Sequence, residues 1–333
     1  MTITFVGPAQ SRFVQNDIAI LERKHTLRIV DANVGRGGSA VINLLKLEFK
    51  IIKSLFGSEI LFFWFADYYS LLPSIVARLL RKRVYVVAGG FDVTYIPEVK
   101  SGARVRPLRW FLVRNTHRFA TRVFPVSNYA QYLLDTNSKH HAPSTVIYNA
   151  VDIAKFPFSE LPREQRVLTV TQLDIVLDYL LKGIDIFLMT AKHMPDVGFD
   201  LIGIRGEALT HARREAKDLP NVTIVEGPIN YETLLEYYNN ASAYCQLSMD
   251  ETFGVATAEA MSCGCIPVVS EVPSLAEVTG GTGEIVSRKN TEQIVSAIRR
   301  TFSADVHARR RCSDHVKMFD IETRAKKLLE LVL

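Results

Sequence analysis

The stretch "DETFGVATAEAMSCGCIPVV", residues 250–269, decides how the rest of the chain is interpreted. Its two glutamates, Glu251 and Glu259, stand eight positions apart and enclose a Phe-Gly pair. The alanines favour a helix that begins at Gly254, because alanine has the highest helix propensity. The segment then ends in a strand-like run, "CIPVV". One carboxylate therefore lies at the expected start of a helix and the other inside it, which suggests a ligand that needs both.

The two glutamates are suited to different tasks. Glu251 comes just before the expected helix, where it can face hydroxyl groups of a ligand or simply complement the helix dipole. Glu259 lies about five residues into the helix and leans back toward its N-terminus. Dipole complementation does not explain an acid so deep on an alanine-rich face that we expect to be buried, because a buried carboxylate needs partners. A ribose diol would be such a partner, as in dinucleotide-binding folds.

The length of the chain, 333 residues, is too great for one ordinary core, so two domains of about 150 residues are expected. The composition, 48% hydrophobic and 23% charged, is that of a folded soluble protein. Short apolar runs alternate with amphipathic ones in both halves, which predicts an α/β protein with two doubly wound parallel sheets. We expect domains at residues 1–150 and 151–303, and helices at 304–333 that cross back to the first domain. The first half closes with a strand-like run, "STVIYNA" (144–150).

Several strand ends in the second half carry residues suited to a ligand, and ligands of doubly wound sheets bind at these ends. Lys182-Gly183 follows the first strand and precedes a helix, where a lysine beside outward-pointing N–H groups can bind phosphate. An ordinary surface lysine is the plainer alternative. Gly203 ends the next strand and permits close approach to the backbone. The turn after Gly227 could hold a flat base against backbone atoms.

The cysteines and the apolar stretches argue against several protein classes. None of the four cysteines lies in a complete metal-ligand pattern, so we expect buried thiols and a reducing, cytoplasmic setting. The start, "MTITFVGPAQ", predicts a first strand rather than a signal peptide. The most apolar stretch, residues 60–80, contains Asp67 and Pro73, and it predicts strand, loop and helix rather than a membrane span.

Charge is divided unevenly along the chain. Residues 1–150 carry 20 Lys and Arg against 9 Asp and Glu, whereas residues 151–333 carry 20 against 26. This asymmetry predicts that the first half meets an anionic partner. Residues 38–57 and 104–122 form basic amphipathic segments with aromatic side chains, which is typical of helices on an anionic membrane surface. The alternative is that the apolar stripes pack on the sheet and the charges are merely solvated. No nucleic-acid recognition motif is visible.

Five motifs, taken together, resemble glycosyltransferase family 4, a large retaining family with the GT-B fold. "ETFGVATAEAMSCGCIPVVS" (251–270) is similar to the family's E-x7-E signature and the strand after it. "VIYNAVDIAKF" (146–156) resembles its N-G-V-D-x-x-x-F at the domain junction, and Lys182-Gly183 its K-G. "NVTIVEGPINYETLLEYYNNASAY" (221–244) resembles its strand, glycine and L-x-x-x-Y stretch, and "VFPVSNYAQYLL" (123–134) its I-x-V-S.

The resemblance implies a fold, a reaction and a set of donor contacts. The expected fold is GT-B, two Rossmann-like domains facing across a cleft, with no cofactor beyond the nucleoside-diphosphate sugar that serves as donor. Glu251 would contact the hydroxyls of the donor sugar, Glu259 the ribose and Lys182 the diphosphate. Further donor contacts would come from the backbone at the start of the helix, at Thr252, Phe253, Gly254 and Val255, and from Pro228 and Ile229, which would flank the base. Gly203 and Arg205, at the end of the preceding strand, are also donor-site candidates, and contacts near Arg205 would help to select the donor.

The sequence departs from the family's pattern at three strand ends. Gln172 stands where the family usually has an arginine that helps neutralise the diphosphate, so Lys182 would act with less help. The first loop carries Gly7 alone instead of a glycine pair. The histidine after the fourth strand is absent, and Asp92 lies nearby instead. We take Asp92 and Asp67, which follow strands of the first domain, as acceptor-side or catalytic candidates; Asp67 could alternatively cap the next helix.

The implied reaction moves a sugar from a nucleoside diphosphate to the hydroxyl of a glycan or lipid-linked acceptor, with retention of configuration. Because no D-x-D triplet occurs in the chain, we expect lysine and helix dipoles, rather than a metal, to stabilise the leaving diphosphate. Two alternatives remain open. One is another nucleotide-sugar enzyme of the GT-B fold, an epimerase or hydrolase, and the other is a basic module that binds nucleic acid or membranes.

Overall fold

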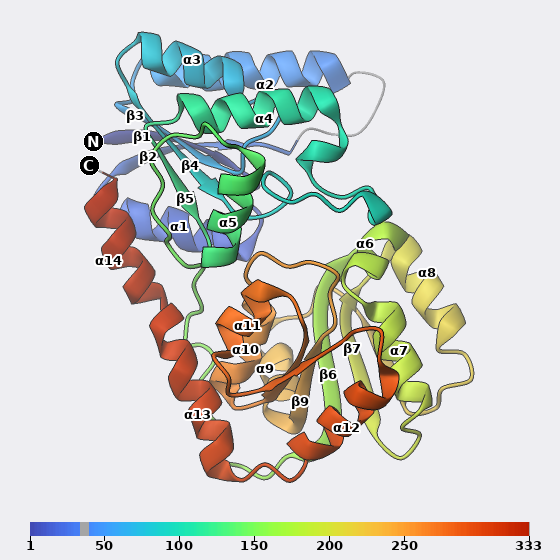
Figure 1. Cartoon of the computed structure of the whole chain (residues 1–333). Helices are drawn as coiled ribbons and strands as arrows, with labels where there is room; N and C mark the ends of the chain where they lie inside the picture. Colours follow the sequence, from blue (N-terminus) through green and yellow to red (C-terminus); the bar gives the residue numbers. More distant parts are fainter. Residues whose placement is uncertain (34–39, 333) are drawn as a thin grey trace. The chain divides into compact units, whose positions relative to one another are not determined.

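The computed structural model describes residues 1–33 and 40–332, and it contains two α/β units, each built on its own parallel sheet (Figure 1). The first unit comprises Met1–Ala150 together with Ile321–Leu333, and the second comprises Val151–Asp320. The predicted fold class, α/β with two Rossmann-like doubly wound domains, is confirmed.

The sheet of the first unit has the strand order β2-β1-β3-β4-β5, with every neighbouring pair parallel. Its three central strands are almost completely buried, as expected of parallel strands that are covered on both faces. The five strands are β1 (Thr2–Gly7), β2 (Thr26–Asp31), β3 (Ile60–Trp64), β4 (Arg83–Ala88) and β5 (Arg122–Pro125).

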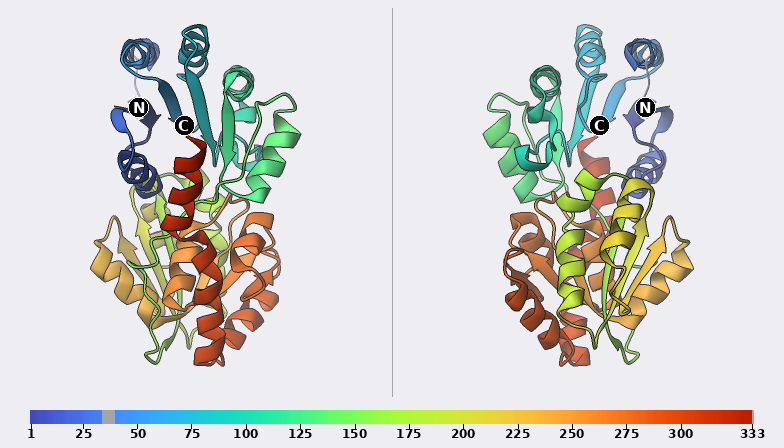
Figure 2. Two further views of the ribbon diagram at one scale, coloured as in Figure 1. Left: turned by 90° about the vertical axis from the view of Figure 1, so that its left-hand side faces the viewer. Right: turned by 90° about the vertical axis from the view of Figure 1, so that its right-hand side faces the viewer.

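Helices cover both faces of this first sheet. The helices α2, α3 and α4 lie side by side on one face, whereas α1, α5 and α14 lie on the other (Figure 1). The side view in Figure 2 shows the first three end-on, in blue to teal. The helices of this unit are α1 (Arg12–Glu22), α2 (Ala40–Leu55), α3 (Leu71–Leu79), α4 (Pro107–Phe119), α5 (Asn128–Asn137) and α14 (Ile321–Leu331).

The predicted strand at 144–150 is wrong, and a proline explains why. The segment runs beside β5, and Thr145 and Ile147 donate N–H groups to the carbonyls of Val123 and Pro125 at 3.0 Å. Only one parallel bridge forms, between Val123 and Ser144. Pro125 has no N–H group and therefore cannot return the next hydrogen bond of the ladder. The segment therefore runs along β5 without becoming a sixth strand of the sheet.

Helix α14 joins the first unit through a buried ion pair that links it to α1. The guanidinium of Arg324 donates from both Nε and Nη2 to the carboxylate of Asp17 at 2.6 Å, and both side chains are buried. Trp64 Nε1 donates to the same carboxylate at 2.6 Å, and Arg324 Nη1 donates to the carbonyls of Ile147 and Tyr148. A buried pair whose remaining polar atoms are satisfied fixes the position of the helix that carries it.

The sheet of the second unit has the order β11-β10-β9-β6-β7-β8, and it is also wholly parallel. From β6 the chain proceeds toward β8 at one edge, and from β9 it proceeds toward β11 at the other. The strand order therefore reverses between β6 and β9, the kind of point where doubly wound sheets bind ligands. The strands are β6 (Glu164–Leu173), β7 (Gly198–Ile204), β8 (Val222–Glu226), β9 (Ala241–Gln246), β10 (Ile266–Ser270) and β11 (Glu284–Val286).

The helices of the second unit form two layers. One layer contains α7, α8 and α12, and the other contains α9, α10 and α11, with α13 packed against α10. The helical C-terminal segment expected from residue 304 is divided, because α13 belongs to the second unit and α14 to the first. The helices are α6 (Val176–Leu181), α7 (Ile184–Lys192), α8 (Gly206–Glu215), α9 (Tyr231–Asn240), α10 (Val255–Cys263), α11 (Pro273–Thr279), α12 (Thr291–Thr301) and α13 (Val306–Val316).

Candidate functional site

Two loops meet where the order of the second sheet reverses. The short helix α6 separates β6 from Lys182, so Lys182 does not follow the strand directly as the sequence suggested. The amide of Met249, in the loop after β9, donates to the carbonyl of Leu181 at 2.7 Å. Gly183 has φ +70°, and a Cβ there would lie 1.9 Å from the carbonyl oxygen of Leu247. Glycine is therefore required at 183 so that the two loops can touch.

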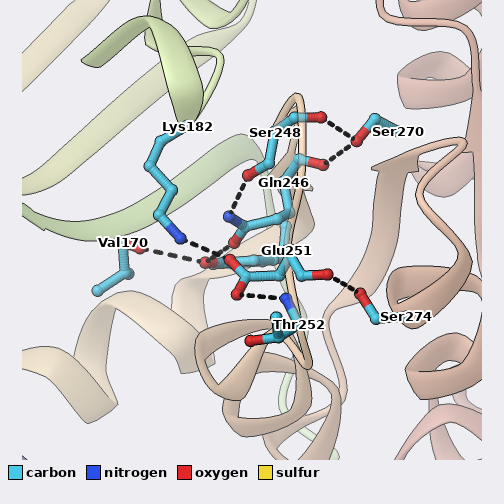
Figure 3. Close-up of polar contacts among 9 residues, drawn as sticks. Val170, Lys182, Gln246, Ser248, Glu251, Thr252, Ser270 and Ser274 are labelled. Atoms are coloured by element: carbon cyan, nitrogen blue, oxygen red, sulfur yellow. Dashed lines mark hydrogen bonds and ion pairs between the residues drawn. The ribbon is translucent and has the colours of Figure 1, made fainter. Parts of the chain in front are cut away.

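This contact brings Lys182 to Glu251. The Lys182 ammonium lies 2.6 Å from Glu251 Oε2, and the side chains are 29% and 16% exposed, respectively (Figure 3). Burial favours a lower pKa for Lys182, but the adjacent Glu251 carboxylate outweighs it, so the pKa is raised above the ordinary 10.5. Lys182 is therefore a permanent cation. Because an ammonium has three donors and Glu251 uses one, the lysine can still bind an anion.

A network of hydrogen bonds holds the loop that carries Glu251 (Figure 3). Gln246 Nε2 donates to Ser248 Oγ at 2.8 Å, and Ser270 Oγ donates to the Ser248 carbonyl at 2.7 Å. Ser274 Oγ donates to the carbonyl of Glu251. These side chains come from β9, β10 and α11, so three elements fix the backbone of one loop. A loop held in this way keeps its carboxylate in place before any ligand arrives.

Tyr244 lies beside this network and close to both glutamates of the opening motif. Its hydroxyl hydrogen-bonds with the Val170 carbonyl at 3.3 Å and with Gln246 Oε1 at 3.1 Å. Burial raises the pKa of Tyr244 well above its ordinary value, and the carboxylates of Glu259 and Glu251 raise it further. Both acids of the opening motif therefore act electrostatically on the same phenol.

Glu259 is the fifth residue of α10 and is 8% exposed, so the expectation of a deep, buried acid is confirmed. Tyr238 Oη donates to Glu259 Oε2 at 3.0 Å. Burial and then Glu259 raise the pKa of Tyr238 well above its ordinary value, so it remains a neutral donor. No role was expected for Tyr238 from the sequence, although it is the tyrosine of the L-x-x-x-Y stretch at 234–238.

The helix α10 begins as the sequence predicts, with Gly254 as its N-cap at φ +95°. Thr252 and Phe253 are buried, and the Phe253 ring packs edge-on against Phe319 at 5.2 Å. Phe253 can therefore offer a ligand only its backbone. The first N–H groups of a helix have no intrahelical acceptor, so the backbone from Thr252 to Val255 lies at the positive end of the helix dipole.

The remaining donor-site candidates lie at or just after the carboxyl ends of β6, β7 and β8. A Cβ at Gly203 would lie 1.9 Å from the Thr171 carbonyl oxygen, so packing between strands alone explains this glycine. Arg205 pairs with Asp174 through Nε. The three other candidates are partly or fully exposed: Gln172, Pro228 and Ile229.

Asp67, in the first unit, is held by an arginine fork. Its two carboxylate oxygens accept hydrogen bonds from Arg109 Nε and Nη2, both at 2.7 Å. The guanidinium also lies 4.2 Å from the ring centroid of Phe91. The alternative role of Asp67 as a helix cap is wrong, because Ser70 occupies the N-cap position of α3. Asp67 accepts the Tyr68 N–H at 2.8 Å instead.

Asp92, the other candidate in the first unit, is completely buried. Its Oδ1 accepts the N–H groups of Gly89 and Gly90 at 3.3 and 3.0 Å, and its Oδ2 lies 3.6 Å from the buried Nε2 of His117. Both acidic candidates of this unit therefore serve internal partners in this structure, and neither presents an open carboxylate.

The described residues offer two further facts about the site's chemistry. Cys245, Cys263 and Cys265 are buried, and burial raises the pKa of each thiol, so none is a ready nucleophile. Among residues 1–33 and 40–332, no three His, Cys, Asp or Glu side chains are grouped to hold a metal ion. In the same part of the chain, no helix has the length and apolarity needed to cross a membrane.

Residues 164–317 match the family model of glycosyl transferases group 1. This range lies within the second unit and contains all of the donor-site candidates. No curated protein sequence gives a significant match to the chain.

Solved structures resemble the whole chain. Sucrose-phosphate synthase from Thermosynechococcus elongatus is similar at 18% identity and a TM-score of 0.81, over 100% of this chain and 98% of that one. HepE from Anabaena, in complex with UDP and glucose, is similar at 15% identity and 0.77, over 100% and 99%. A glycosyltransferase from Rickettsia africae is similar at 15% and 0.73, over 99% and 97%. These likenesses show the fold, which is the GT-B fold.

Proposed function

We propose that the protein is a retaining, metal-independent glycosyltransferase, similar to family 4, that transfers a sugar from a nucleoside diphosphate to an acceptor hydroxyl. The observation that carries the proposal is the ion pair between Lys182 and Glu251 at the point where the second sheet reverses its strand order. A permanent cation beside a fixed carboxylate suits a ligand that carries both phosphates and hydroxyls. The match of residues 164–317 to glycosyl transferases group 1 supports the same class.

Each candidate residue receives a role in donor binding. Lys182 and the N-terminus of α10 bind the diphosphate, because one is a cation and the other is the positive end of a helix dipole. Glu251 accepts hydrogen bonds from the sugar hydroxyls, and Glu259 accepts them from the ribose. The base lies against the turn at Pro228 and Ile229, and the exposed Gln172 donates a neutral hydrogen bond to a phosphate oxygen.

The transfer step builds negative charge on the diphosphate. The bond between the anomeric carbon and the diphosphate oxygen breaks, a bond to the acceptor oxygen forms on the same face, and the acceptor's proton passes to the departing diphosphate oxygen. The sugar gains oxocarbenium character while the leaving oxygens become more negative. Lys182 stabilises that charge without reorganisation, because the pair with Glu251 already holds it in place.

The proposed donor is tested by thermal shift with UDP-, GDP-, ADP- and dTDP-sugars in the presence of EDTA. A ligand that binds only the folded state raises the melting temperature. HepE was crystallised with UDP-glucose, so UDP-sugars are the first to try. We expect one base to give a shift that Lys182→Ala and Glu259→Ala both reduce. A folded protein that responds to none of the four would contradict the proposal and favour a binding module.

We further propose that the first unit meets an anionic membrane surface that carries a lipid-linked or glycan acceptor. Leu47, Ile51 and Leu55 of α2 pack on the sheet, which explains one apolar stripe of the basic segment 38–57, whose residues 38 and 39 lie outside the described residues. Five further apolar residues of this segment are exposed: Val41, Ile42, Leu45, Phe49 and Phe56. Apolar side chains that lie exposed beside lysines favour a membrane surface over a merely solvated helix.

The second basic segment, 104–122, shows the same division. Val113, Thr116 and His117 of α4 are buried, whereas Leu108, Phe111 and Phe119 are exposed. We expect binding to vesicles that contain phosphatidylglycerol, weakened by salt and by replacing Phe49 and Phe111 with serine. Equal binding to neutral phosphatidylcholine vesicles, or no binding to either, would contradict this part of the proposal.

A further inference from the structure

A pocket of about 320 Å³ opens on the first unit, far along the chain from the donor-site candidates. It lies between the turn at Ala103–Val105, helix α4 and the end of α5. Its size is within the range that small-molecule sites usually have. The walls are mainly cationic and aromatic and include Arg104, Trp110, Arg114, Asn137, Lys139 and His140.

The charge of this pocket is uncompensated. Its lining contains two arginines, a lysine and a histidine but no carboxylate. Arg104, Arg114 and Lys139 form no ion pair within the part of the chain that the structure describes. Arg109, on the same helix as Arg114, differs because it pairs with Asp67 at 2.7 Å. Three cations on one concave surface repel each other, so the pocket is electrostatically prepared for an anion.

Neutral groups hold Arg104 in position. Its Nη1 donates to Asn137 Oδ1 at 2.9 Å, and its guanidinium lies 4.8 Å from the ring centroid of Tyr95. Asn137 is fixed in turn, because its Nδ2 donates to the carbonyl of Val93 at 2.8 Å. These contacts orient the guanidinium without neutralising it, so its remaining N–H groups keep their full charge for a ligand.

We propose that this pocket binds a phosphate group of a phosphorylated ligand, a mono- or diester. A guanidinium fork matches phosphate geometry, and Lys139 adds a further cation to the lining. Trp110 offers a flat apolar surface to the part of the ligand next to the phosphate. The dipole of α5 could account for Lys139, which follows its C-terminal end, but it does not account for Arg104 and Arg114, which come from other elements.

The fluorescence of Trp110 can report on the pocket directly. The chain has two tryptophans, and the other, Trp64, is 1% exposed. Iodide is an anionic quencher and should concentrate in the pocket, whereas neutral acrylamide should not. We expect phosphate and glycerol phosphate to protect Trp110 from iodide more strongly than chloride does at equal ionic strength. Trp110→Phe should remove the quenchable signal, which confirms its source.

Variants separate this pocket from the donor site. Removing a cation about 6 Å from the quencher should lower iodide quenching about threefold in a water-like dielectric. Arg104→Gln with Arg114→Gln should therefore reduce iodide quenching severalfold and abolish phosphate protection, while acrylamide quenching stays unchanged if the fold is intact. Lys24→Gln, an exposed lysine of the same unit, is the matched control. Lys182→Ala should keep the protection, because the pocket does not depend on the donor site.

The same measurement identifies the source of the phosphate. If glycerol phosphate protects Trp110 from iodide, the ligand is a soluble phosphate ester. If only phosphatidylglycerol vesicles protect it, the ligand is a lipid headgroup. Phosphate that protects no better than chloride, in the absence of any protection by these vesicles, would overturn the proposal. Protection that survives in the Arg104→Gln, Arg114→Gln variant would overturn it as well.

Discussion

The two units contain ion pairs that look alike but differ in what they leave free. In each pair the acid follows a strand that lies beside the point where the strand order of its sheet reverses. This strand is β3 for Asp67 and β9 for Glu251. Asp67 occupies both arms of the Arg109 fork, and the guanidinium also stacks on Phe91. Glu251 accepts one hydrogen bond from the Lys182 ammonium. In the arginine pair the Nε–Nη2 edge and both carboxylate oxygens are engaged with each other, which is typical of a structural pair, whereas the lysine keeps two N–H donors that can receive an anion.

Among the variants that test this difference between the pairs, Asp67→Asn is expected to have the largest effect on stability. This substitution removes the carboxylate charge, keeps the shape of the side chain and leaves Arg109 with no ionic partner. The side chains of Asp67 and Arg109 are only 18% and 22% exposed, so water compensates the lost charge poorly. We expect the free energy of unfolding to fall by about 2 kcal/mol, below the full cost for a wholly buried pair. Urea denaturation measures this fall.

The control for Asp67 is an exposed pair. Asp135 lies 2.7 Å from His141 with its side chain 55% exposed, so Asp135→Asn should change stability by less than about 0.5 kcal/mol. UDP affinity should be unchanged in both variants. Equal stability of the two variants would mean that the bidentate Asp67–Arg109 pair stabilises the fold no more than an ordinary surface pair.

A smaller effect is expected from Tyr238→Phe, which removes the donor to Glu259 and leaves the ring in place. The lost hydrogen bond should lower stability by about 1–2 kcal/mol, because its acceptor is a buried charged group. We also expect UDP to bind more weakly in calorimetric titration, since Glu259 loses the contact that orients it. Unchanged UDP affinity in a variant with lowered stability would show that Tyr238 serves the fold alone.

The smallest effect concerns pH. The pKa of Lys182 is raised above its ordinary 10.5, so its contribution to folding and to anion binding is complete below that value. It is lost only as pH rises through the higher folded value. We therefore expect UDP affinity to vary by less than about twofold between pH 7.5 and 9. A tenfold decline over this interval would mean that Lys182 deprotonates there and is not a permanent cation.

The sequence predicts the elements of the site better than the contacts between them. The start of α10 at Gly254 and the depth of Glu259 follow from local propensity, and the structure has both. The pair of Lys182 with Glu251 joins residues 69 positions apart, and no local rule predicts it. The partners Arg109 and Tyr238 were missed for the same reason, since both are set by packing of distant elements. The strand wrongly predicted at 144–150 is different, because the missing N–H group of Pro125 follows from the sequence alone.

Calorimetric titration with UDP in EDTA shows whether Lys182 and Glu251 form a donor site that is ready for an anion. Parent protein, Asp67→Asn and Lys192→Ala, an exposed lysine on α7, should bind UDP equally. Lys182→Ala should weaken binding at least about tenfold, the loss expected for a charge-assisted hydrogen bond. Equal UDP affinity in Lys182→Ala and the parent, or no binding to either, would mean that Lys182 and Glu251 do not form this site.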